Sequence, residues 1–354
     1  MGHASTHASR LRSERTHILT RRAPAVRPSS APPPLHWGHG IRAHPDPILR
    51  ARRRGGAGPL DRPGGPPAPR RYARDVAPEP RGARPLPPGG RGGAALHGGP
   101  GYNSFSFRDL VGDALEDFQL LYADQRGSGR SYSASPFDLD LLADDVRAVL
   151  DALEAPKATL LAHGFGAQVA VRAATRTPQH FERLVMVNPW LSMPLLARDL
   201  QRRAAQEVGH LDDALPPESA LADPETLDPD LLVDQAFGWV NAKTLFDRMQ
   251  FPDPSSRLRL EHADATALFG PQEAPEPAGV WRLDVLTELA VLRLPTVVLI
   301  GTQDATAYPA QAEAALERLP HALTSLLEAG HYPWIDDPET FLPLLRQALQ
   351  VRSS

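Results

Sequence analysis

The chain of 354 residues contains no cysteine. This absence excludes disulfide bonds, thiolate metal sites and a cysteine nucleophile, and it fits a protein of the reducing cytoplasm. Long hydrophobic runs are also missing, because none approaches the roughly 18–20 apolar residues that a membrane-spanning helix needs. We therefore expect a cytoplasmic protein without a membrane partner.

Lysine is absent from residues 1–95, where 18 arginines accompany five acidic residues. The rest of the chain is acidic, so the net charge of −4 conceals two chemically different parts. Residues 1–93 also hold 17 of the 38 prolines and show no sustained hydrophobic periodicity. Such a segment buries too little apolar surface to offset the entropy of ordering it, and we predict a disordered Arg/Pro/Gly-rich extension.

Four interpretations of this extension stay open. A basic arm for nucleic acid needs aromatic residues among its arginines, and only Trp37 and Tyr72 are present, so no nucleic-acid partner is expected. A transit peptide up to about Arg27, or a myristoylation pattern at residues 1–6, is the second. The third is a plain disordered tail. The fourth is GC-rich DNA read in the wrong frame or from too early a start, because Arg, Pro, Ala, Gly and His dominate the segment.

From Ala94 onward, short apolar runs alternate with helical patterns, which is typical of an α/β fold with a parallel sheet flanked by helices. Helix 138–154 shows the helical pattern most clearly, since leucines and valines at 139, 142, 146, 149, 150 and 153 fall on one face. Further helices are expected at residues 167–176, 310–319 and 338–349. Strands are expected at residues 94–96, 119–123, 158–162, 184–187, 296–300 and 323–327.

Residues 189–284 interrupt this alternation. They contain no strand-like apolar run, are rich in proline and acidic residues, and predict short helices. They form either a lid over the carboxyl ends of the strands, where such sheets bind ligands, or a solvated helical decoration. On the first interpretation the core comprises residues 94–188 and 285–354, and the lid residues 189–284.

Glycine-rich or polar motifs follow five of the expected strands. Each motif is weak alone, but their order and their place at strand ends make the set informative. The motifs are His97-Gly98-Gly99-Pro100-Gly101, Asp124-Gln125-Arg126-Gly127-Ser128-Gly129-Arg130-Ser131, Ala162-His163-Gly164-Phe165-Gly166, Gly301-Thr302-Gln303-Asp304 and Gly330-His331-Tyr332-Pro333-Trp334.

The set resembles the motifs of the α/β-hydrolase superfamily, and the first two are similar to its proline iminopeptidase branch. The resemblance covers about residues 94–350. It implies a mostly parallel sheet flanked by helices, with a helical lid. It also implies two or three strands before residue 94, and this sequence lacks them. Because the strand before His97 is reduced to residues 94–96, we expect a weak sheet edge there.

The resemblance also implies roles for single residues. The family order of nucleophile, acid and base falls on Gly164, Asp304 and His331. The oxyanion hole would use the backbone N–H groups of Gly99, on the loop of residues 97–101, and of Phe165. No metal and no cofactor are implied.

Glycine stands where the family carries its nucleophilic serine. That position has a strained backbone with positive φ, which glycine adopts freely, so Gly164 should keep the turn while removing the attacking oxygen. Losing such a nucleophile costs about 10⁶ in rate, and ordinary acyl-enzyme catalysis is not expected. Whether Ser104, Ser106 or Ser128 reaches the site does not follow from the sequence, and His163 is expected to be structural.

Two functional hypotheses remain. In the first, His331 and Asp304 act as an acid–base pair on a small molecule or short peptide, with hydrolase-like acyl or amide chemistry that does not need serine. In the second, the chain is a catalytically inactive protein that binds or senses a small molecule in the same pocket. Lid carboxylates anchor the substrate amine in the peptidases of the family. Here no motif selects such a carboxylate, and the acidic residues are better interpreted as a solvated face (Asp223, Glu225, Asp228, Asp230, Asp234).

Overall fold

The computed structural model describes residues 92–129, 131, 137–155, 157–209, 228–264 and 279–350. The predicted disorder of residues 1–93 lies outside the described residues, apart from the first two residues of strand β1. Asp223 and Glu225 lie outside them as well.

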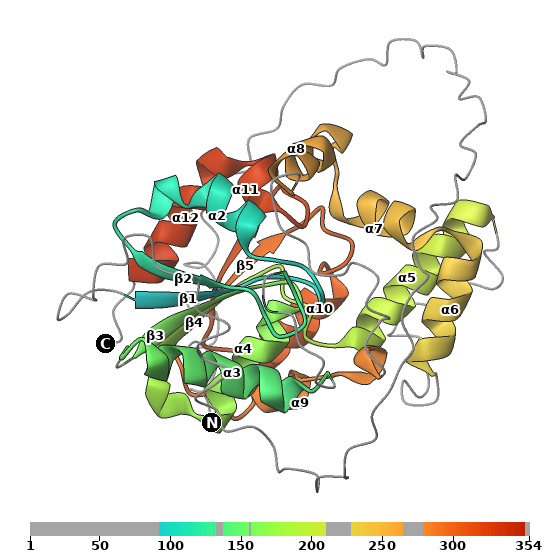
Figure 1. The fold of residues 1–354 in the computed structure, drawn as a ribbon. Coiled ribbons are helices and arrows are strands. Elements are labelled where there is room, and N and C mark those ends of the chain that lie inside the picture. The colour runs from blue at the N-terminus through green and yellow to red at the C-terminus, as the bar shows by residue number, and fades with distance from the viewer. Residues whose placement is uncertain are drawn as a thin grey trace, which may run out of the picture. The chain divides into compact units, whose positions relative to one another are not determined.

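The described residues form a six-stranded sheet in the order β2-β1-β3-β4-β5-β6 (Figure 1). All five strand pairings are parallel, as the alternation of strands and helices predicts. Every expected strand is present, and β4 begins three residues earlier than expected. The strands are β1 (Gly92–Leu96), β2 (Gln119–Ala123), β3 (Ala158–His163), β4 (Phe181–Val187), β5 (Thr296–Gly301) and β6 (Leu323–Leu327).

Strand β1 is an interior strand. It pairs with β2 on one side and with β3 on the other, and its residues 94–96 are buried. The expectation of a sheet edge at this strand is therefore wrong in its location. Strand β2 is the edge strand on this side of the described sheet, and its five residues are all half-buried.

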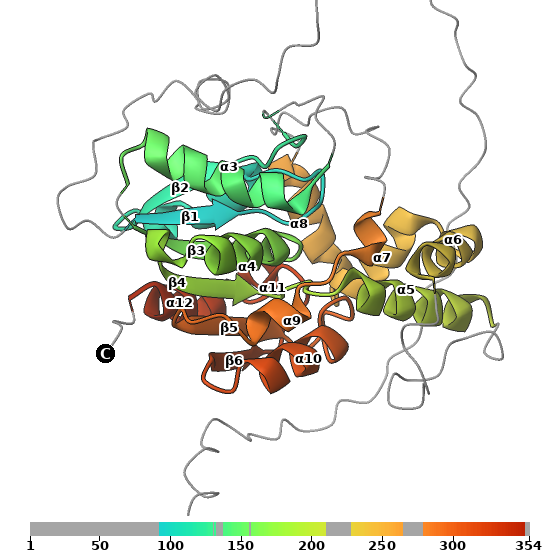
Figure 2. The same cartoon turned by 90° about the horizontal axis from the view of Figure 1, so that it is seen from below.

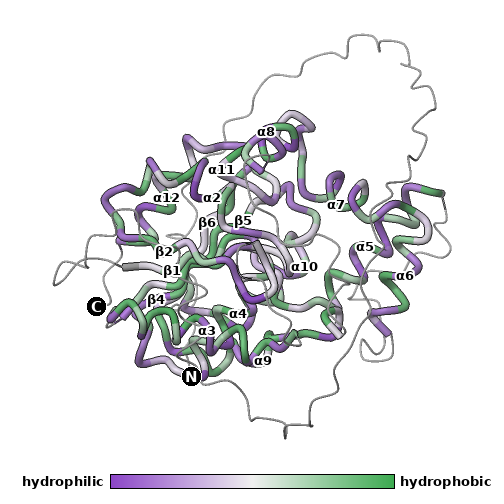
Figure 3. The backbone as a smooth tube through the Cα atoms, in the orientation of Figure 1, coloured by the Kyte–Doolittle hydropathy of each residue, from purple (hydrophilic) through white to green (hydrophobic). Residues whose placement is uncertain are grey.

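Helices cover both faces of the sheet (Figures 1 and 2). Side chains alternate between the two faces along each strand, so that Leu160 joins one apolar core and Leu161 the other. Figure 3 shows the apolar residues gathered in the strands and on the inner helix faces. One face carries α3 (Leu139–Ala152), α4 (Gly166–Arg176), α9 (Leu286–Leu289) and α10 (Ala310–Arg318), and the other carries α2 (Phe105–Val111), α11 (Pro333–Asp336) and α12 (Pro338–Gln350).

Helix α3 illustrates how the sequence pattern produces a packed element. The Asp138 side chain caps its first turn by accepting hydrogen bonds from the N–H groups of Asp140 and Leu141. Four of the six expected face residues are buried: Leu139, Leu142, Val146 and Leu150. Leu153 is 47% exposed because the helix ends before it, at Ala152.

The described part of residues 189–284 is helical, as expected. It holds α5 (Met193–Val208), α6 (Pro229–Trp239), α7 (Ala242–Gln250) and α8 (Pro254–Asp264). Helices α5 and α6 pack against each other beside the sheet, while α8 lies against α2 and α11 (Figures 1 and 2). None of the helices in the described ranges combines the length and apolar character needed to cross a bilayer.

Candidate active site

Two sequence-predicted residues form a buried hydrogen-bonded pair at the carboxyl end of the sheet. Asp304 follows β5 and His331 follows β6, and the His331 Nδ1–H donates to Asp304 Oδ2 over 2.6 Å. The side chains are 2% and 0% exposed for His331 and Asp304 respectively. A carboxylate only accepts, so Nδ1 carries the proton and Nε2 is left as the acceptor. This tautomer is the one that a general base requires.

The second oxygen of Asp304 is bound by Thr306. Asp304 Oδ1 accepts from the Thr306 backbone N–H at 2.9 Å and from its hydroxyl at 2.5 Å. Thr306 Oγ1 in turn accepts from Trp190 Nε1–H at 3.0 Å. Such donors offset the cost of burying a carboxylate. Sequence reasoning missed both residues, and the only local signal was a threonine two residues after an aspartate, a spacing that permits an Asx-turn.

Asn188 connects the ends of β4, β5 and β6. Its side-chain amide donates to the carbonyl oxygens of Gly330 at 2.9 Å and His331 at 3.0 Å, while its Oδ1 accepts from Gly301 N–H at 2.6 Å. The residue is fully buried with φ +44°, a conformation that asparagine tolerates better than most residues. Sequence reasoning gave Asn188, the residue after the expected strand 184–187, no role.

The end of helix α7 supports both loops of the pair. The Gln250 carbonyl accepts the His331 N–H at 2.8 Å, and the Met249 carbonyl accepts the Ala305 N–H at 2.8 Å. Helix α7 belongs to the inserted segment, so that segment contributes to the position of both side chains.

Gly164 lies directly beside the base. It has the predicted left-handed conformation, with φ +51°. A β-carbon at this position would stand 3.1 Å from His331 Nε2. The structure therefore brings the expected nucleophile position, acid and base together. Two residues later, a β-carbon on Gly166 would come within 2.6 Å of the His97 and Leu96 carbonyl oxygens, so α4 approaches β1 this closely only because that residue is glycine.

Two backbone N–H groups near Gly164 have no acceptor within the described ranges. They are those of Gly99 and Phe165, the residues expected to form an oxyanion hole. Phe165 precedes the first turn of α4, so its N–H belongs to a helix N-terminus, which favours negative charge. Gly99 has φ +128° and is followed by a cis peptide bond to Pro100.

His97 anchors the loop that carries Gly99. Its Nε2 accepts from Gln125 N–H at 2.8 Å, and its Nδ1–H donates to the Gly98 carbonyl at 2.6 Å. The Gln125 side chain donates back to the His97 carbonyl at 2.7 Å. These bonds fix the loop after β1 to the loop after β2. The loop after β1 ends at Gly101, which has a left-handed backbone with φ +88°.

His163 packs against the base. The two imidazole centroids are 4.3 Å apart, and the His163 Nε2–H donates to the His331 carbonyl at 2.9 Å. Burial, reinforced by the neighbouring His331, holds the pKa of His163 well below its usual value. A neutral, buried, hydrogen-bonded ring is consistent with the structural role expected for it.

The serines considered as substitutes bond elsewhere. Ser104 donates from its hydroxyl to Asp124 Oδ1 at 2.8 Å, and Ser106 shares a hydrogen bond of 3.1 Å with the Tyr102 hydroxyl. Ser128 is buried and pairs through its backbone with Ser131. Within the described ranges the His331 ring bonds only to Asp304 and Thr306, so no serine there takes the place of the missing nucleophile.

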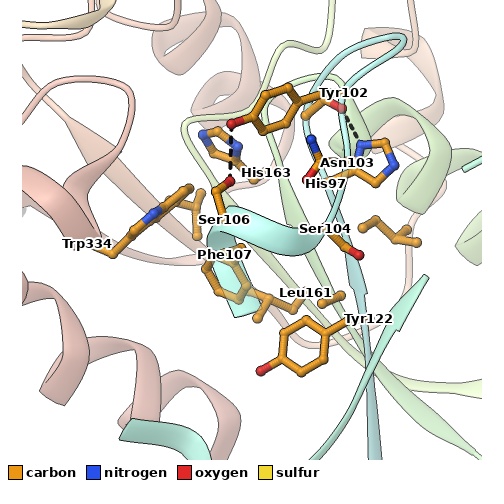
Figure 4. Close-up of a pocket in the computed structure, with 14 residues that line it drawn as sticks. His97, Tyr102, Asn103, Ser104, Ser106, Phe107, Tyr122, Leu161, His163 and Trp334 are labelled. Atoms are coloured by element: carbon orange, nitrogen blue, oxygen red, sulfur yellow. Dashed lines mark hydrogen bonds between the residues drawn. The ribbon is translucent and has the colours of Figure 1, made fainter. Parts of the chain in front are cut away.

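A small cavity adjoins the site beside His163 and Trp334 (Figure 4). Tyr102 and Ser106 point toward each other at its wall, and the Tyr102 hydroxyl donates to the Asp264 carboxylate at 2.7 Å. Burial raises the pKa of both Tyr102 and Asp264. The cavity has room for about one water molecule, so it extends the site without holding a substrate.

Aromatic rings close the site from the side of the inserted helices. The Trp190 ring stacks on His331 with centroids 5.1 Å apart, and Phe246 of α7 stacks on Trp190 at 5.9 Å. The three described members of the expected acidic face lie at the surface: Asp228 and Asp230 pair with exposed Arg282, and Asp234 is exposed. In the part of the chain that the structure describes, no group of three or more His, Asp or Glu side chains is arranged as a metal site.

Comparison with known proteins identifies relatives with a similar fold and sequence. The structure aligns with that of a proline iminopeptidase-related protein from Thermus thermophilus, with a TM-score of 0.62 and 38% identity over 74% of this chain and 90% of that one. The sequence is 24% identical over 266 residues to a proline iminopeptidase of Heyndrickxia coagulans, covering 73% of this chain and 90% of the relative.

A third relative is much longer than this protein. The polyketide synthase ThaQ of Burkholderia thailandensis is 29% identical over 258 residues, which are 72% of this chain and 12% of the synthase. The family model for the alpha/beta hydrolase fold matches residues 95–338. Together with the six-stranded sheet and the loops at its carboxyl end, this match shows that the chain belongs to the α/β-hydrolase family.

Proposed function

We propose that the protein hydrolyses small esters or prolyl amides by direct attack of water, with His331 as general base and Asp304 as the residue that orients it. The observation that carries the proposal is the position of His331 Nε2. It lies 3.1 Å from where a β-carbon on Gly164 would stand, and its partner atom Nδ1 is held by Asp304 at 2.6 Å.

The chemistry needs a nucleophile that is not attached to the protein. Water beside Gly164 gives its proton to His331 Nε2 and bonds to the carbonyl carbon of the substrate. The N–H groups of Gly99 and Phe165 would then bind the oxyanion, and His331 returns the proton to the leaving group. Residues 189–284 would act as the lid that keeps bulk water away, supported by the stacking of Phe246 on Trp190.

The expected rate is low. Removing a serine nucleophile costs about 10⁶, while binding and the oxyanion hole leave about 10³–10⁴ over the uncatalysed reaction. Esters should react faster than amides, because the oxygen of an ester is a better leaving group than the nitrogen of an amide. The similarity to a proline iminopeptidase-related protein is the reason to include prolyl amides.

The experiment is hydrolysis of p-nitrophenyl esters and prolyl arylamides by the native protein, Gly164→Ser, His331→Ala and the double variant. His321→Ala is a matched control, since His321 is a histidine before β6 that lies away from the site. Native turnover that His331→Ala abolishes and His321→Ala preserves supports the proposal. If Gly164→Ser turns over and the native protein does not, the proposal is contradicted. The native protein would then bind a small molecule without converting it.

A further inference from the structure

The backbone around Gly164 leaves a defined space against the base. The atoms nearest to a β-carbon at this position are His331 Nε2 at 3.1 Å, His331 Cε1 at 3.4 Å and Gly98 Cα at 3.7 Å. The imidazole and the backbone of the loop after β1 are therefore its near walls. Gly98 cannot gain a side chain freely, since its own β-carbon would stand 3.3 Å from His163 Nδ1.

A heavy atom at the β-carbon position would lie 3.1 Å from His331 Nε2, which is hydrogen-bonding distance for oxygen or nitrogen and a close contact for carbon. A serine here would add a hydroxymethyl group. A hydroxymethyl group has two heavy atoms, and its volume is close to the roughly 30 Å³ that one water molecule occupies in the liquid. Any molecule of one or two heavy atoms with a transferable proton matches that volume. We expect a branched molecule to be too large for a position this close to the imidazole and to the Gly98 backbone.

We propose that this space is a binding site for a second substrate, a small protic nucleophile such as a primary alcohol or an amine of one or two heavy atoms. The protein then transfers acyl groups to that nucleophile in competition with water. The inference rests on the proposed function, because it uses the same base and the same acyl substrate.

The transfer step balances without another reactant. The nucleophile's O–H or N–H proton moves to His331 Nε2 while its oxygen or nitrogen bonds to the acyl carbon. The bond from that carbon to the leaving group then breaks, and the departing oxygen takes the proton from His331. An alcohol gives a new ester, hydroxylamine gives a hydroxamate, and no covalent enzyme intermediate forms.

Size selection distinguishes this route from that of a serine hydrolase. In an acyl-enzyme the protein already carries the first nucleophile, and the acceptor arrives from the open side of the acyl group. Here the acceptor must occupy the serine position itself. Methanol and hydroxylamine should therefore be accepted, while 2-propanol should be rejected.

The test measures product ratios by mass spectrometry, with a p-nitrophenyl ester and increasing methanol, hydroxylamine or 2-propanol. The native protein should form methyl ester and hydroxamate with saturating concentration dependence, and at least about tenfold less isopropyl ester. In Gly164→Ala the methyl group fills the space, and both hydrolysis and transfer should fall at least about tenfold. Gly209→Ala is the matched control, since Gly209 has φ +77° and open space around its β-carbon.

Transfer that is equal for methanol and 2-propanol, or that survives Gly164→Ala, would overturn the inference. So would native, His331-dependent hydrolysis from which neither methanol nor hydroxylamine diverts product, although the proposed function would then stand. A complete lack of His331-dependent hydrolysis would overturn the proposed function. Thermal melts of each variant separate these outcomes from loss of folding.

Discussion

The side-chain amide of Asn188 donates a hydrogen bond to the carbonyl oxygen of His331 at 3.0 Å, across 143 residues of sequence. The same amide NH₂ group donates to the Gly330 carbonyl, and the side-chain Oδ1 of Asn188 accepts from the Gly301 N–H at the end of β5. One buried side chain therefore sets the spacing between the loops that carry the acid and the base.

Replacing Asn188 with alanine should weaken both the fold and the site. Three buried hydrogen bonds are lost, polar groups are left without partners, and alanine must adopt φ +44°. We expect the free energy of unfolding to fall by about 2–4 kcal/mol, measured by urea denaturation. Asn241→Ala, at the exposed cap of α7, should cost about 1 kcal/mol. Equal losses in the two variants would argue against the role given to Asn188.

Asp304→Asn tests whether the acid acts by fixing the tautomer of His331. Asparagine has nearly the same shape but presents either a weaker acceptor or a donor to Nδ1, which leaves Nε2 protonated in part of the molecules. His331-dependent turnover should fall by about 10²–10⁴ while the thermal midpoint changes little. The same fall should appear in the Gly164→Ser background, measured as kcat on one ester. An unchanged kcat in both backgrounds would show that His331 does not need the carboxylate.

His163 should make the protein sensitive to acid. Its pKa is held well below normal in the folded state by burial, whereas in the unfolded chain it titrates near about 6.5. Below that pH the unfolded chain binds the extra proton, so this residue's contribution to stability is full at higher pH and declines as the pH falls.

His163→Gln removes this titration and keeps a side-chain N–H donor. The loss of unfolding free energy between pH 7.5 and 5 should be smaller in the variant by about 1–2 kcal/mol, from denaturation at each pH. The control His321→Gln, outside the site, should leave the native pH dependence in place. If the His163 variant loses stability with pH as steeply as the native protein, the ring is not held neutral.

Phe246 should control access to the base. His331 is 2% exposed beneath the Trp190 ring, and the half-buried Phe246 ring stacks on that tryptophan. Phe246→Ala removes the outer ring and should speed modification of His331 by diethyl pyrocarbonate several-fold, followed by peptide mapping. Modification of His321 in the same sample gives the reference rate. Equal His331 rates in native and variant protein would place the path to the base elsewhere.

The sequence predicts the sheet well because each strand is a short apolar run between turn residues. The resemblance to the family's motif order also identifies the acid–base pair, whose two loops follow neighbouring parallel strands. The sequence does not predict the contacts that support the acid–base pair. Asn188, Trp190 and Thr306 belong to common residue types with no motif, and their importance arises from bonds between segments far apart in the chain.

The sequence pattern also did not predict that β1 is an interior strand of the sheet. Residues 94–96 are too short and too small to indicate an interior strand by their composition. Their burial comes from pairing on both sides, with Ala94 opposite Leu121 of β2 and Leu160 of β3. Strand neighbours in a parallel sheet are decided by tertiary packing, which a linear pattern does not record.

The last turn of α7 restricts how this scaffold can diversify. The Met249 and Gln250 carbonyl groups bind the loop after Asp304 and the loop of His331, so the inserted segment is joined to the reacting groups at the end of α7, between α6 and α8. New substrate preferences could arise by exchanging α5 and α6, which touch neither loop through these bonds. Replacing the whole inserted segment would remove the bonds that position His331. An exchange of helices between related proteins should therefore end before Met249.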